Sequence, residues 1–422
     1  MVFASINLGA VPVVMASAAS TCIGSPKCKK GGGTPAPLVG GRIVEMRLSR
    51  RTLLQAASAA AGAAILAPTC GSVMALPNDR LARDAFAPAE GARSRVLIIN
   101  DLCGDIDGLF ATTHALLSRS TSVCGIVGSR ARPAANFPTR TPERSVELAD
   151  EILRLMGLTG AVPTFAGGAP LSSLTVPVKS AGAQAIIDEG MRADTTLPLF
   201  VTVGAGLSEV ASALLIEPRL ADRLTLVWIG GHALPSGRAA ENNFNIDPLA
   251  AQVVFNQSAV PIWQVPSDAY RTCIISATEL QAYVAPYGAI GAWLYRKLLE
   301  DPRKLIPDKV TFGETYRLGD GALVLLTALS DLRPVSHAPA LTDQRTSSSS
   351  FQETVAPRFN VDGTYTSPEV GRKIRVYTSL DTRMMFSDFF AKMRVNFGVE
   401  SVDIRGHFSK SRRPLVPAAS SR

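Results

Sequence analysis

The sequence predicts an α/β fold in which a mostly parallel, open sheet carries helices on both faces. From about Arg95 onward, short runs rich in Val, Ile and Leu alternate with longer stretches whose apolar residues recur at helical spacing. Buried parallel strands read as continuous apolar runs, and the crossover between two such strands is normally a helix. A hydrophobic content of 46% over 422 residues also provides enough apolar surface for a well-buried core.

Six short, β-branched runs are predicted as the strands of this sheet. They are residues 96–100, 123–127, 198–203, 224–229, 260–265 and 374–377. Seven amphipathic stretches fit as helices between and after the strands. They are residues 109–117, 143–156, 207–216, 248–256, 289–299, 322–329 and 382–395. The polar, serine-rich segment 346–350 is interpreted as an exposed loop before the last strand and helix.

The distribution of charge argues against a nucleic-acid partner. The formal net charge is +8, but seven Lys and Arg residues and a single Glu precede residue 76, so about +6 belongs to the N-terminal segment. The remaining chain is nearly neutral, at about +2. Nucleic-acid binding requires a concentration of basic residues on the folded surface, and we therefore expect no such partner.

The N-terminal segment resembles a twin-arginine export signal. Arg50 and Arg51 are followed by an uncharged, alanine-rich run at 56–67 and then by Val73 and Ala75, small residues of the kind that signal peptidase requires. Met46 stands at the usual distance for a start codon, so we expect residues 1–45 to be a disordered extension or sequence upstream of the true start. Residues 46–75 would then be the signal peptide, 76–94 a linker and 95–422 the folded domain. The resemblance implies the twin-arginine export machinery as a partner and a periplasmic or secreted location.

The cysteines of the folded part do not form a recognisable framework. Cys103, Cys124 and Cys273 are odd in number and scattered, with no spacing typical of zinc ligands. We interpret them as small buried hydrophobic residues. Their use agrees with a chain that folds in a reducing cytoplasm before export.

Polar residues directly after the first strand are the strongest candidates for chemistry. Ligands of open parallel sheets bind beyond the carboxyl ends of the strands, where helix N-termini also point. The first strand runs into the turn 100–108 (NDLCGDIDG), which carries Asp101, Asp105 and Asp107 just before a helix. Three carboxylates in one turn repel each other unless a cation or several backbone N–H groups compensate. One Asp would be an ordinary helix cap, whereas three indicate a functional turn.

This turn resembles the opening motif of the nucleoside hydrolases, D-T-D-P-G-x-D-D, and in particular the inosine-uridine preferring members. The resemblance implies that Asp101 contacts calcium and acts as the general base, and that Asp107 contacts the ribose hydroxyls. The second Asp of the closing pair, a calcium ligand in the family, is Gly108 here. We hypothesise that Asp105 supplies the missing oxygen through a shifted turn.

Three further segments resemble the family in the same order along the chain. T-V-G-A-G-L-S at 202–208 is similar to the family's T-G-P-L-T-N loop, which implies a calcium ligand in the carbonyl of Gly204 and leaves Glu209 unexplained. W-I-G-G at 228–231 is similar to the M-G-G strand end and puts Ile229 beneath the nucleoside. The most specific match is E-N-N-F-N-I-D-P at 241–248, which implies that Glu241 and Asn243 bind the ribose. Turn and capping roles are the alternative for these last two residues.

L-G-D at 318–320 resembles the family's H-D pair near a late helix. It implies that Asp320 is the last calcium ligand, although a helix cap is the alternative for this residue. The family's leaving-group histidine is Gly319 here, which is the second departure from the pattern.

Other polar residues near the predicted strand ends have weaker support. His232 follows the double glycine and could approach a leaving base, although a structural role is the alternative. His114 falls on the buried face of the first helix and is interpreted as a core residue. Four residues flank the predicted mouth and could stack on a base or bind it, with surface packing as the alternative: Tyr270, Arg271, Tyr316 and Arg317. Asp268 follows a strand end without a motif and stays unassigned.

The resemblance implies an exported hydrolase that cleaves the N-glycosidic bond of ribonucleosides to ribose and base. Water bound to calcium and activated by Asp101 would be the nucleophile, while His232, Tyr270 or an undemanding leaving group would compensate for Gly319. The alternative is a degenerate member that binds a nucleoside or ribosyl ligand without hydrolysis, because Gly108 and Gly319 have removed catalytic side chains. The sequence leaves open the base preference and whether the chain forms a homo-oligomer.

Overall fold

The structure is a computed structural model that describes residues 91–132, 140–233, 240–301, 314–330 and 349–398, all within the unit Cys70–Arg422. The expected extension, signal peptide and most of the linker, residues 1–90, lie outside the described residues. Within the described residues, no helix is long and apolar enough to cross a membrane.

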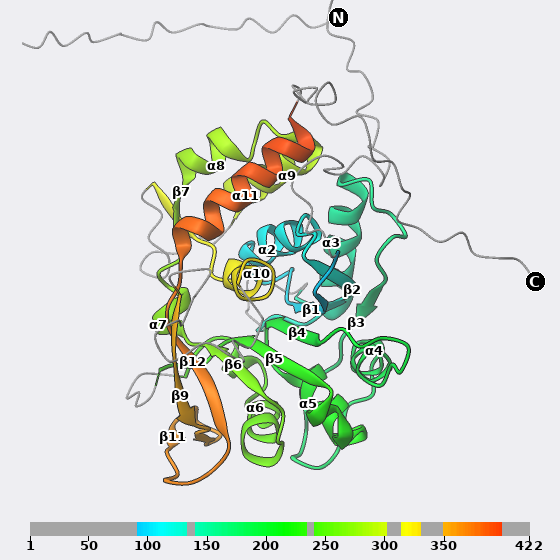
Figure 1. Cartoon of the computed structure of the whole chain (residues 1–422), viewed down its shortest axis with the longest axis vertical. Coiled ribbons are helices and arrows are strands. Elements are labelled where there is room, and N and C mark those ends of the chain that lie inside the picture. The colour runs from blue at the N-terminus through cyan, green and yellow to red at the C-terminus, as the bar shows by residue number, and fades with distance from the viewer. Residues whose placement is uncertain (1–90, 133–139, 234–239, 302–313, 331–348, 399–422) are drawn as a thin grey trace, which may run out of the picture. The chain divides into compact units, whose positions relative to one another are not determined.

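One sheet of eight strands organises the domain (Figure 1). Its strands in spatial order are β3 (Thr164–Ala166), β2 (Thr121–Gly128), β1 (Ser94–Asn100), β4 (Leu199–Gly204), β5 (Leu224–Ile229), β6 (Ile262–Val265), β12 (Lys373–Ser379) and β9 (Ser350–Val355). All neighbouring pairs are parallel except β12 and β9, which are antiparallel. The predicted mostly parallel open sheet is confirmed.

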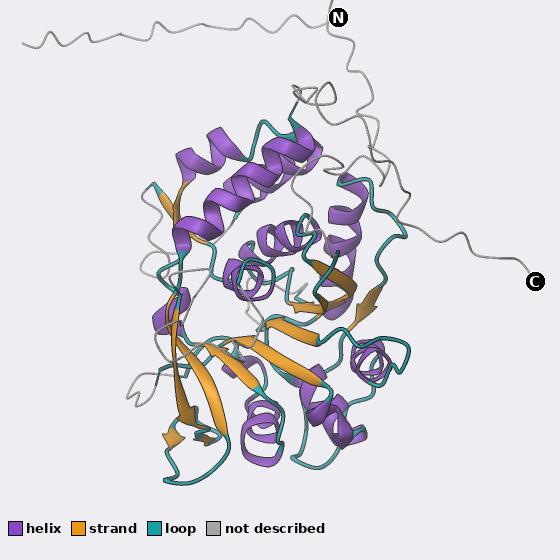
Figure 2. Ribbon diagram, in the orientation of Figure 1, coloured by secondary structure: helices purple, strands orange, loops and turns teal. Residues whose placement is uncertain are grey.

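Helices cover both faces of this sheet, as Figures 1 and 2 show. One face packs against α2 (Asp107–Leu116), α3 (Pro142–Leu155), α8 (Ala277–Tyr283), α9 (Gly288–Glu300), α10 (Gly321–Thr327) and α11 (Thr382–Phe397). The other packs against α4 (Ala181–Gly190), α5 (Ser208–Ile216), α6 (Pro248–Gln252) and the π-helical turn η4 (Val253–Gln257). Strand β1 shows why both faces are buried: Val96 and Ile98 belong to the first core, whereas Leu97 and Ile99 belong to the second.

Short elements complete the domain. They are the helices η2 (Pro218–Asp222), η3 (Phe244–Ile246) and α7 (Ser267–Tyr270), and the strand pairs β7 (Ile274–Ser276) with β8 (Thr315–Arg317) and β10 (Arg358–Phe359) with β11 (Tyr365–Thr366). The β10–β11 pair matters for the site because it carries Tyr365, whose hydroxyl reaches the loop after β5.

The predicted strands and helices all recur, with end shifts of a few residues, but the sequence missed several elements. β3 has three residues, too few for a periodic signal. Helix α4 is rich in Ala and Gly, although the N-cap Ser180, which accepts from the Ala183 amide, was a readable start signal. The loop interpretation of 346–350 is wrong at Ser350, which begins β9; residues 346–348 lie outside the described residues.

His114 is a core residue, as predicted, with 2% of its surface exposed. Its Nε2 lies 2.7 Å from Asp388 Oδ2 on α11, and Lys392 Nζ lies 2.5 Å from the same oxygen. Lys392 also donates to Ser118 Oγ at 2.9 Å. This polar network fixes the last helix to α2, the helix whose first residue is Asp107.

Candidate active site at the carboxyl edge of the sheet

Strand register brings the candidate residues together at one edge. Asn100, the last residue of β1, pairs with Gly128 of β2 and with Gly204 of β4, so three strands end at the same level. Ligands of doubly wound sheets bind at this edge.

The Asp-rich turn distributes its carboxylates over different neighbours. Asp101 is buried, at 5% exposure, and lies against Gly104, where an added β-carbon would come within 2.6 Å of Asp101 Oδ2. Asp105 Oδ1 accepts from the hydroxyl of Tyr316 at 2.9 Å. Asp107 begins α2, and its Oδ2 accepts from the backbone N–H of Asp320 at 3.3 Å. The turn therefore connects β1 directly to the start of α10.

Asn100 organises the centre of the site, a role that the sequence analysis did not assign. Its Nδ2 donates to Asp320 Oδ2 at 2.8 Å, across 220 positions of sequence. A β-carbon added to Gly108 would collide with Asn100 Oδ1, and one added to Gly204 would lie 2.6 Å from Asn100 Nδ2 and collide with the Asp320 carboxylate. Both glycines therefore make room for a buried amide–carboxylate pair. The signal was available, since Asn100 is a polar residue at a strand end.

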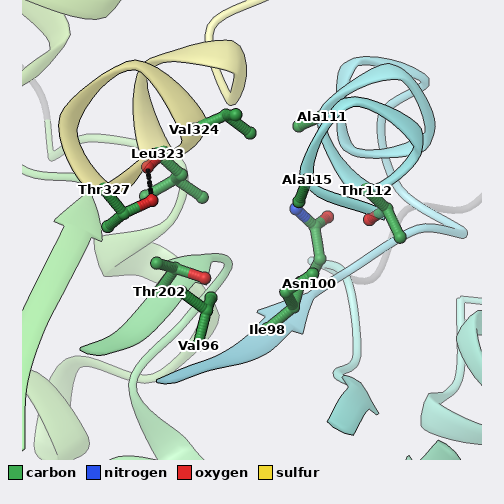
Figure 3. A pocket seen from close by; sticks show the side chains of 10 residues that line it. All are labelled: Val96, Ile98, Asn100, Ala111, Thr112, Ala115, Thr202, Leu323, Val324 and Thr327. Carbon is green, nitrogen blue, oxygen red and sulfur yellow. Dashed lines mark hydrogen bonds between the residues drawn. The ribbon is translucent and has the colours of Figure 1, made fainter. Parts of the chain in front are cut away.

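A small cavity lies beside Asn100 and between α2, α10, β1 and β4 (Figure 3). It has a volume of about 10 Å³ and is lined by Asn100, Thr112, Thr202 and Thr327 together with apolar residues. The volume is close to that of one water molecule and far below that of a ligand pocket. It is a packing feature beside Asn100 and not a substrate site.

Asp320 carries the clearest electrostatic sign of a functional site. It is 4% exposed, and burial raises the pKa of its carboxyl well above the ordinary value. The charges of Asp101, Asp105 and Glu241 raise this pKa further, while the hydrogen bond from Asn100 opposes the shift. The alternative role as a helix cap is not realised, because the Asp320 side chain makes no capping hydrogen bond to α10.

The carboxylate and carbonyl oxygens of the site are ligands of the type that calcium prefers, and a bound cation would relieve the repulsion among the buried acids. Within the described ranges, however, no three Asp, Glu, His or Cys side chains are grouped to hold a metal ion. A bound ion would have to draw Asp101, Asp105, Asp320 and the Gly204 carbonyl together.

Glu241 is the hub of the opposite side of the site. Its Oε2 accepts from the backbone N–H groups of Gly231 and Asn243 at 2.9 Å and of Phe244 at 3.1 Å. Its Oε1 accepts from the hydroxyl of Tyr270 at 2.8 Å. The turn role considered for Glu241 is therefore realised by one oxygen, while the other faces the side chain of α7.

The remaining predicted residues surround this hub. Asn243 Nδ2 donates to the carbonyl of Ile229 at 2.9 Å, which ties the loop to the end of β5. His232 is 4% exposed, its Nδ1 lies 2.6 Å from Ser267 Oγ, and its backbone N–H donates to Tyr365 Oη at 2.7 Å. Tyr365 comes from β11, and no sequence signal near 365 indicated this contact.

Residues at the predicted mouth divide into buried and exposed groups. Tyr316 is buried at 4% exposure and its hydroxyl also lies 2.9 Å from Asp301 Oδ2, so it does not present an open stacking face. Arg271 and Arg317 are exposed. Asp268 Oδ2 accepts from the Ala233 backbone N–H at 2.8 Å, which gives this unassigned residue a role in holding the loop after His232.

Glu209, which the resemblance left unexplained, lies fully buried beside the site. It accepts from Ser129 Oγ at 3.1 Å and from the Gly168 backbone N–H at 3.2 Å. Burial raises the pKa of this carboxyl from its ordinary value of 4.5 to about 7. Glu209 thus links the chain after β2, the chain after β3 and the start of α5.

The fold and site together define an α/β protein with acidic side chains gathered at the carboxyl ends of its parallel strands. Residues 100–352 match the family of inosine-uridine preferring nucleoside hydrolases. Because the match spans more than half of the chain, the protein belongs to this family.

Short segments of the chain are also similar to curated proteins. The chain is 41% identical to the inosine-uridine preferring nucleoside hydrolases of Crithidia fasciculata, over 83 residues, and of Leishmania major, over 78 residues. These matches cover 19% and 18% of this chain and about a quarter of each relative, 25% and 24%.

The fold is similar over a much longer range. A purine-preferring ribonucleoside hydrolase from Gardnerella vaginalis is 16% identical, with a TM-score of 0.55 over 72% of this chain and 100% of that chain. An inosine-uridine preferring nucleoside hydrolase from Bacillus anthracis is 14% identical, with a TM-score of 0.51 over 71% and 99% of the two chains. At these identities the likeness establishes the fold.

The contact between Asn100 and Gly108 can be tested by a double-mutant cycle. Gly108→Ala introduces a β-carbon against Asn100 Oδ1 and should lower the free energy of unfolding by about 1–3 kcal/mol, although Ala favours a helix. Asn100→Ala leaves the Asp320 carboxylate without its amide donor and should cost about 1–3 kcal/mol. In the double variant the smaller side chain at position 100 makes room for the added methyl group at position 108, so the loss should be less than the sum by about 1 kcal/mol. Strictly additive losses in urea unfolding would contradict the contact.

The raised pKa of Glu209 predicts a pH-dependent stability. Below about pH 4.5 the carboxyl is neutral in both folded and unfolded chains, so it contributes no penalty there. As the pH rises from about 4.5 to about 7, the Glu209 carboxyl ionises in the unfolded chain but stays protonated in the folded chain, so roughly 3 kcal/mol of stability is lost. Glu209→Gln should remove this loss. Between pH 5 and 8 the free energy of unfolding of the variant should therefore rise relative to that of the parent protein, by on the order of 3 kcal/mol. Urea unfolding at several pH values checks it, with the exposed Glu369→Gln as control; parallel stability curves for the parent protein and Glu209→Gln would refute it.

Proposed function

We propose that the protein hydrolyses the N-glycosidic bond of ribonucleosides, releasing ribose and the free base. Family membership supports the reaction class. The observation that carries the proposal within the chain is the meeting of acidic residues from distant segments: Asp107 Oδ2 accepts from the backbone N–H of Asp320 at 3.3 Å, and Asn100, directly before Asp101, donates to Asp320 Oδ2 at 2.8 Å. Glycosidic cleavage passes through a transition state with positive charge on the sugar, which such negative charge stabilises.

Asp101 is the proposed general base. It follows β1 directly, is buried, and would accept the proton of the attacking water. Asp101, Asp105, Asp320 and the Gly204 carbonyl would hold the calcium that the family resemblance implies, whose chemistry when bound is Lewis-acid activation of a nucleophile.

The ribose would be gripped from both sides of the site. Asp107, at the start of α2, and Glu241 can accept hydrogen bonds from sugar hydroxyls, and Asn243 stands next to the end of β5. Fixing the sugar in this way converts binding into orientation of the reacting carbon.

A residue other than 319 would have to protonate the leaving base, because the histidine of the family's H-D pair is Gly319 here and has no side chain. Burial, and the neighbouring Glu241, raise the pKa of Tyr270, which makes its phenol a reluctant proton donor. His232 is therefore the better candidate acid. A substrate whose base leaves without protonation is the other solution.

We also propose that the chain is exported through the twin-arginine route to the periplasm or beyond. The support is the sequence around Arg50 and Arg51 and the absence of any disulfide requirement in the described domain, whose Cys103, Cys124 and Cys273 are all free thiols.

The reaction is tested by assaying the purified chain with inosine, uridine and p-nitrophenyl riboside, with and without chelator. Turnover should fall by about 10²- to 10⁴-fold in Asp101→Asn, the usual contribution of a general base. Asp222→Asn, on the exposed surface after α5, should leave turnover unchanged. Loss of activity with chelator, restored by calcium, would support the metal.

Two results would contradict this proposal. Turnover that survives unchanged in Asp101→Asn would reject the assigned base. Saturable nucleoside binding without turnover of any of the three compounds would favour the alternative of a ribosyl-binding protein.

Export is tested by replacing both arginines in the full chain with Lys. Arg50→Lys with Arg51→Lys should retain the protein in the cytoplasm of a bacterial host that has the twin-arginine machinery. Fractionation followed by immunoblotting measures the distribution. Undiminished export of the double variant would exclude this route.

A further inference from the structure

Tyr270 fills the place that a side chain at 319 would take. It is the last residue of α7, which follows β6 at the carboxyl edge of the sheet. A β-carbon added to Gly319 would lie 3.0 Å from Tyr270 Cδ2, 3.5 Å from Tyr270 Cβ and 3.5 Å from Asp107 Oδ2. The tyrosine ring therefore covers Gly319 from the adjoining segment and lies beside the Asp-rich turn.

The other end of Tyr270 reaches Glu241. Its hydroxyl donates to Glu241 Oε1 at 2.8 Å, while three backbone N–H groups occupy Oε2. The donor to Oε1 is thus a side chain, whereas the donors to Oε2 are backbone groups. Tyr270 thus spans the site, from the start of α10 and α2 on one side to the loop 241–244 on the other.

We propose that Tyr270 is a positioning residue of the ribosyl site, which holds Glu241 Oε1 in the orientation that receives a sugar hydroxyl. The inference rests on the proposed function, because Glu241 binds ribose there. A phenol has a single proton, and here that proton is committed to the carboxylate, so a ribose hydroxyl must approach Oε1 along its remaining lone pair. Tyr270 in this way fixes the direction from which the acceptor oxygen can be approached before the ligand arrives.

The geometry also separates this role from simple packing. The ring alone would cover Gly319, and Phe would do this equally well, whereas the hydrogen bond to Glu241 needs the hydroxyl. Since the contact acts on ribose binding in the ground state and the transition state alike, it should affect KM and not kcat.

The test compares Tyr270→Phe with the parent chain. Removal of the hydroxyl should raise the Kd for free ribose and the KM for inosine by about 10- to 100-fold, the range for a hydrogen bond to a charged group. The value of kcat should change by less than about threefold. Tyr377→Phe, at a buried tyrosine of β12 that packs on Trp263, is the matched control and should leave both constants unchanged.

The outcomes distinguish this inference from the proposed function. A Tyr270→Phe protein with the ribose affinity and KM of the parent would overturn the positioning role while leaving the hydrolase intact. A lower kcat with an unchanged KM would also overturn it, in favour of a role with the leaving base. If the parent chain binds no ribose and cleaves no nucleoside, the proposed function fails first and the inference falls with it. Thermal unfolding of each variant, with and without ribose, shows whether a loss of affinity reflects loss of folding.

Discussion

The site depends on how one buried carboxylate, Asp320, is accommodated. Burial and three neighbouring acids oppose its ionisation, and the amide of Asn100 is the side chain that donates to it. For this amide to reach Asp320, both Gly108 and Gly204 must lack a side chain, because a β-carbon at either position would meet Asn100. The start of α2 and the end of β4 are therefore fixed by the same hydrogen bond. The Asp-rich turn inherits its path from this constraint, since Asp107 in turn accepts from the backbone of Asp320.

The sheet could be predicted from the sequence because its strands are buried on both faces. Continuous apolar runs such as that of β1 leave few other interpretations, and the helices between them follow from right-handed crossovers. The edges were harder. β3 is too short for a pattern and β9 carries exposed polar residues, as expected for strands with a single neighbour. Helix α4 was not predicted because alanine and glycine give weak periodicity, even though its N-cap serine is a recognisable start signal.

The sequence predicted the approximate place of the site residues better than it predicted their contacts. The rule that polar residues after parallel strands gather at one edge pointed to Asp101 and Asp107, whereas Gly204, Glu241 and Asp320 were implied by the family resemblance. The partners of these residues were not predictable, because they come from distant segments: Asn100 meets Asp320 across 220 positions, and Tyr365 meets His232 across 133. Tertiary packing decides which side chain fills the space beside a glycine. A single sequence shows the glycine but not the side chain that packs against it. For this reason the sequence analysis assigns no role to Asn100 and places Tyr270 only among the residues that flank the predicted mouth.

That observation changes the meaning of the two glycines. Taken alone, Gly108 and Gly319 indicate lost side chains and favour a protein that binds without reacting. In the structure each glycine is covered by a polar side chain, Asn100 in one case and Tyr270 in the other, and each of these donates to a carboxylate of the site. Burying Asp101, Asp320 and Glu241 together is costly in free energy, and a site that served only to hold a neutral sugar would gain nothing from it. A transition state with positive charge on the sugar does gain from it, and we infer that the site is rearranged for catalysis rather than dismantled.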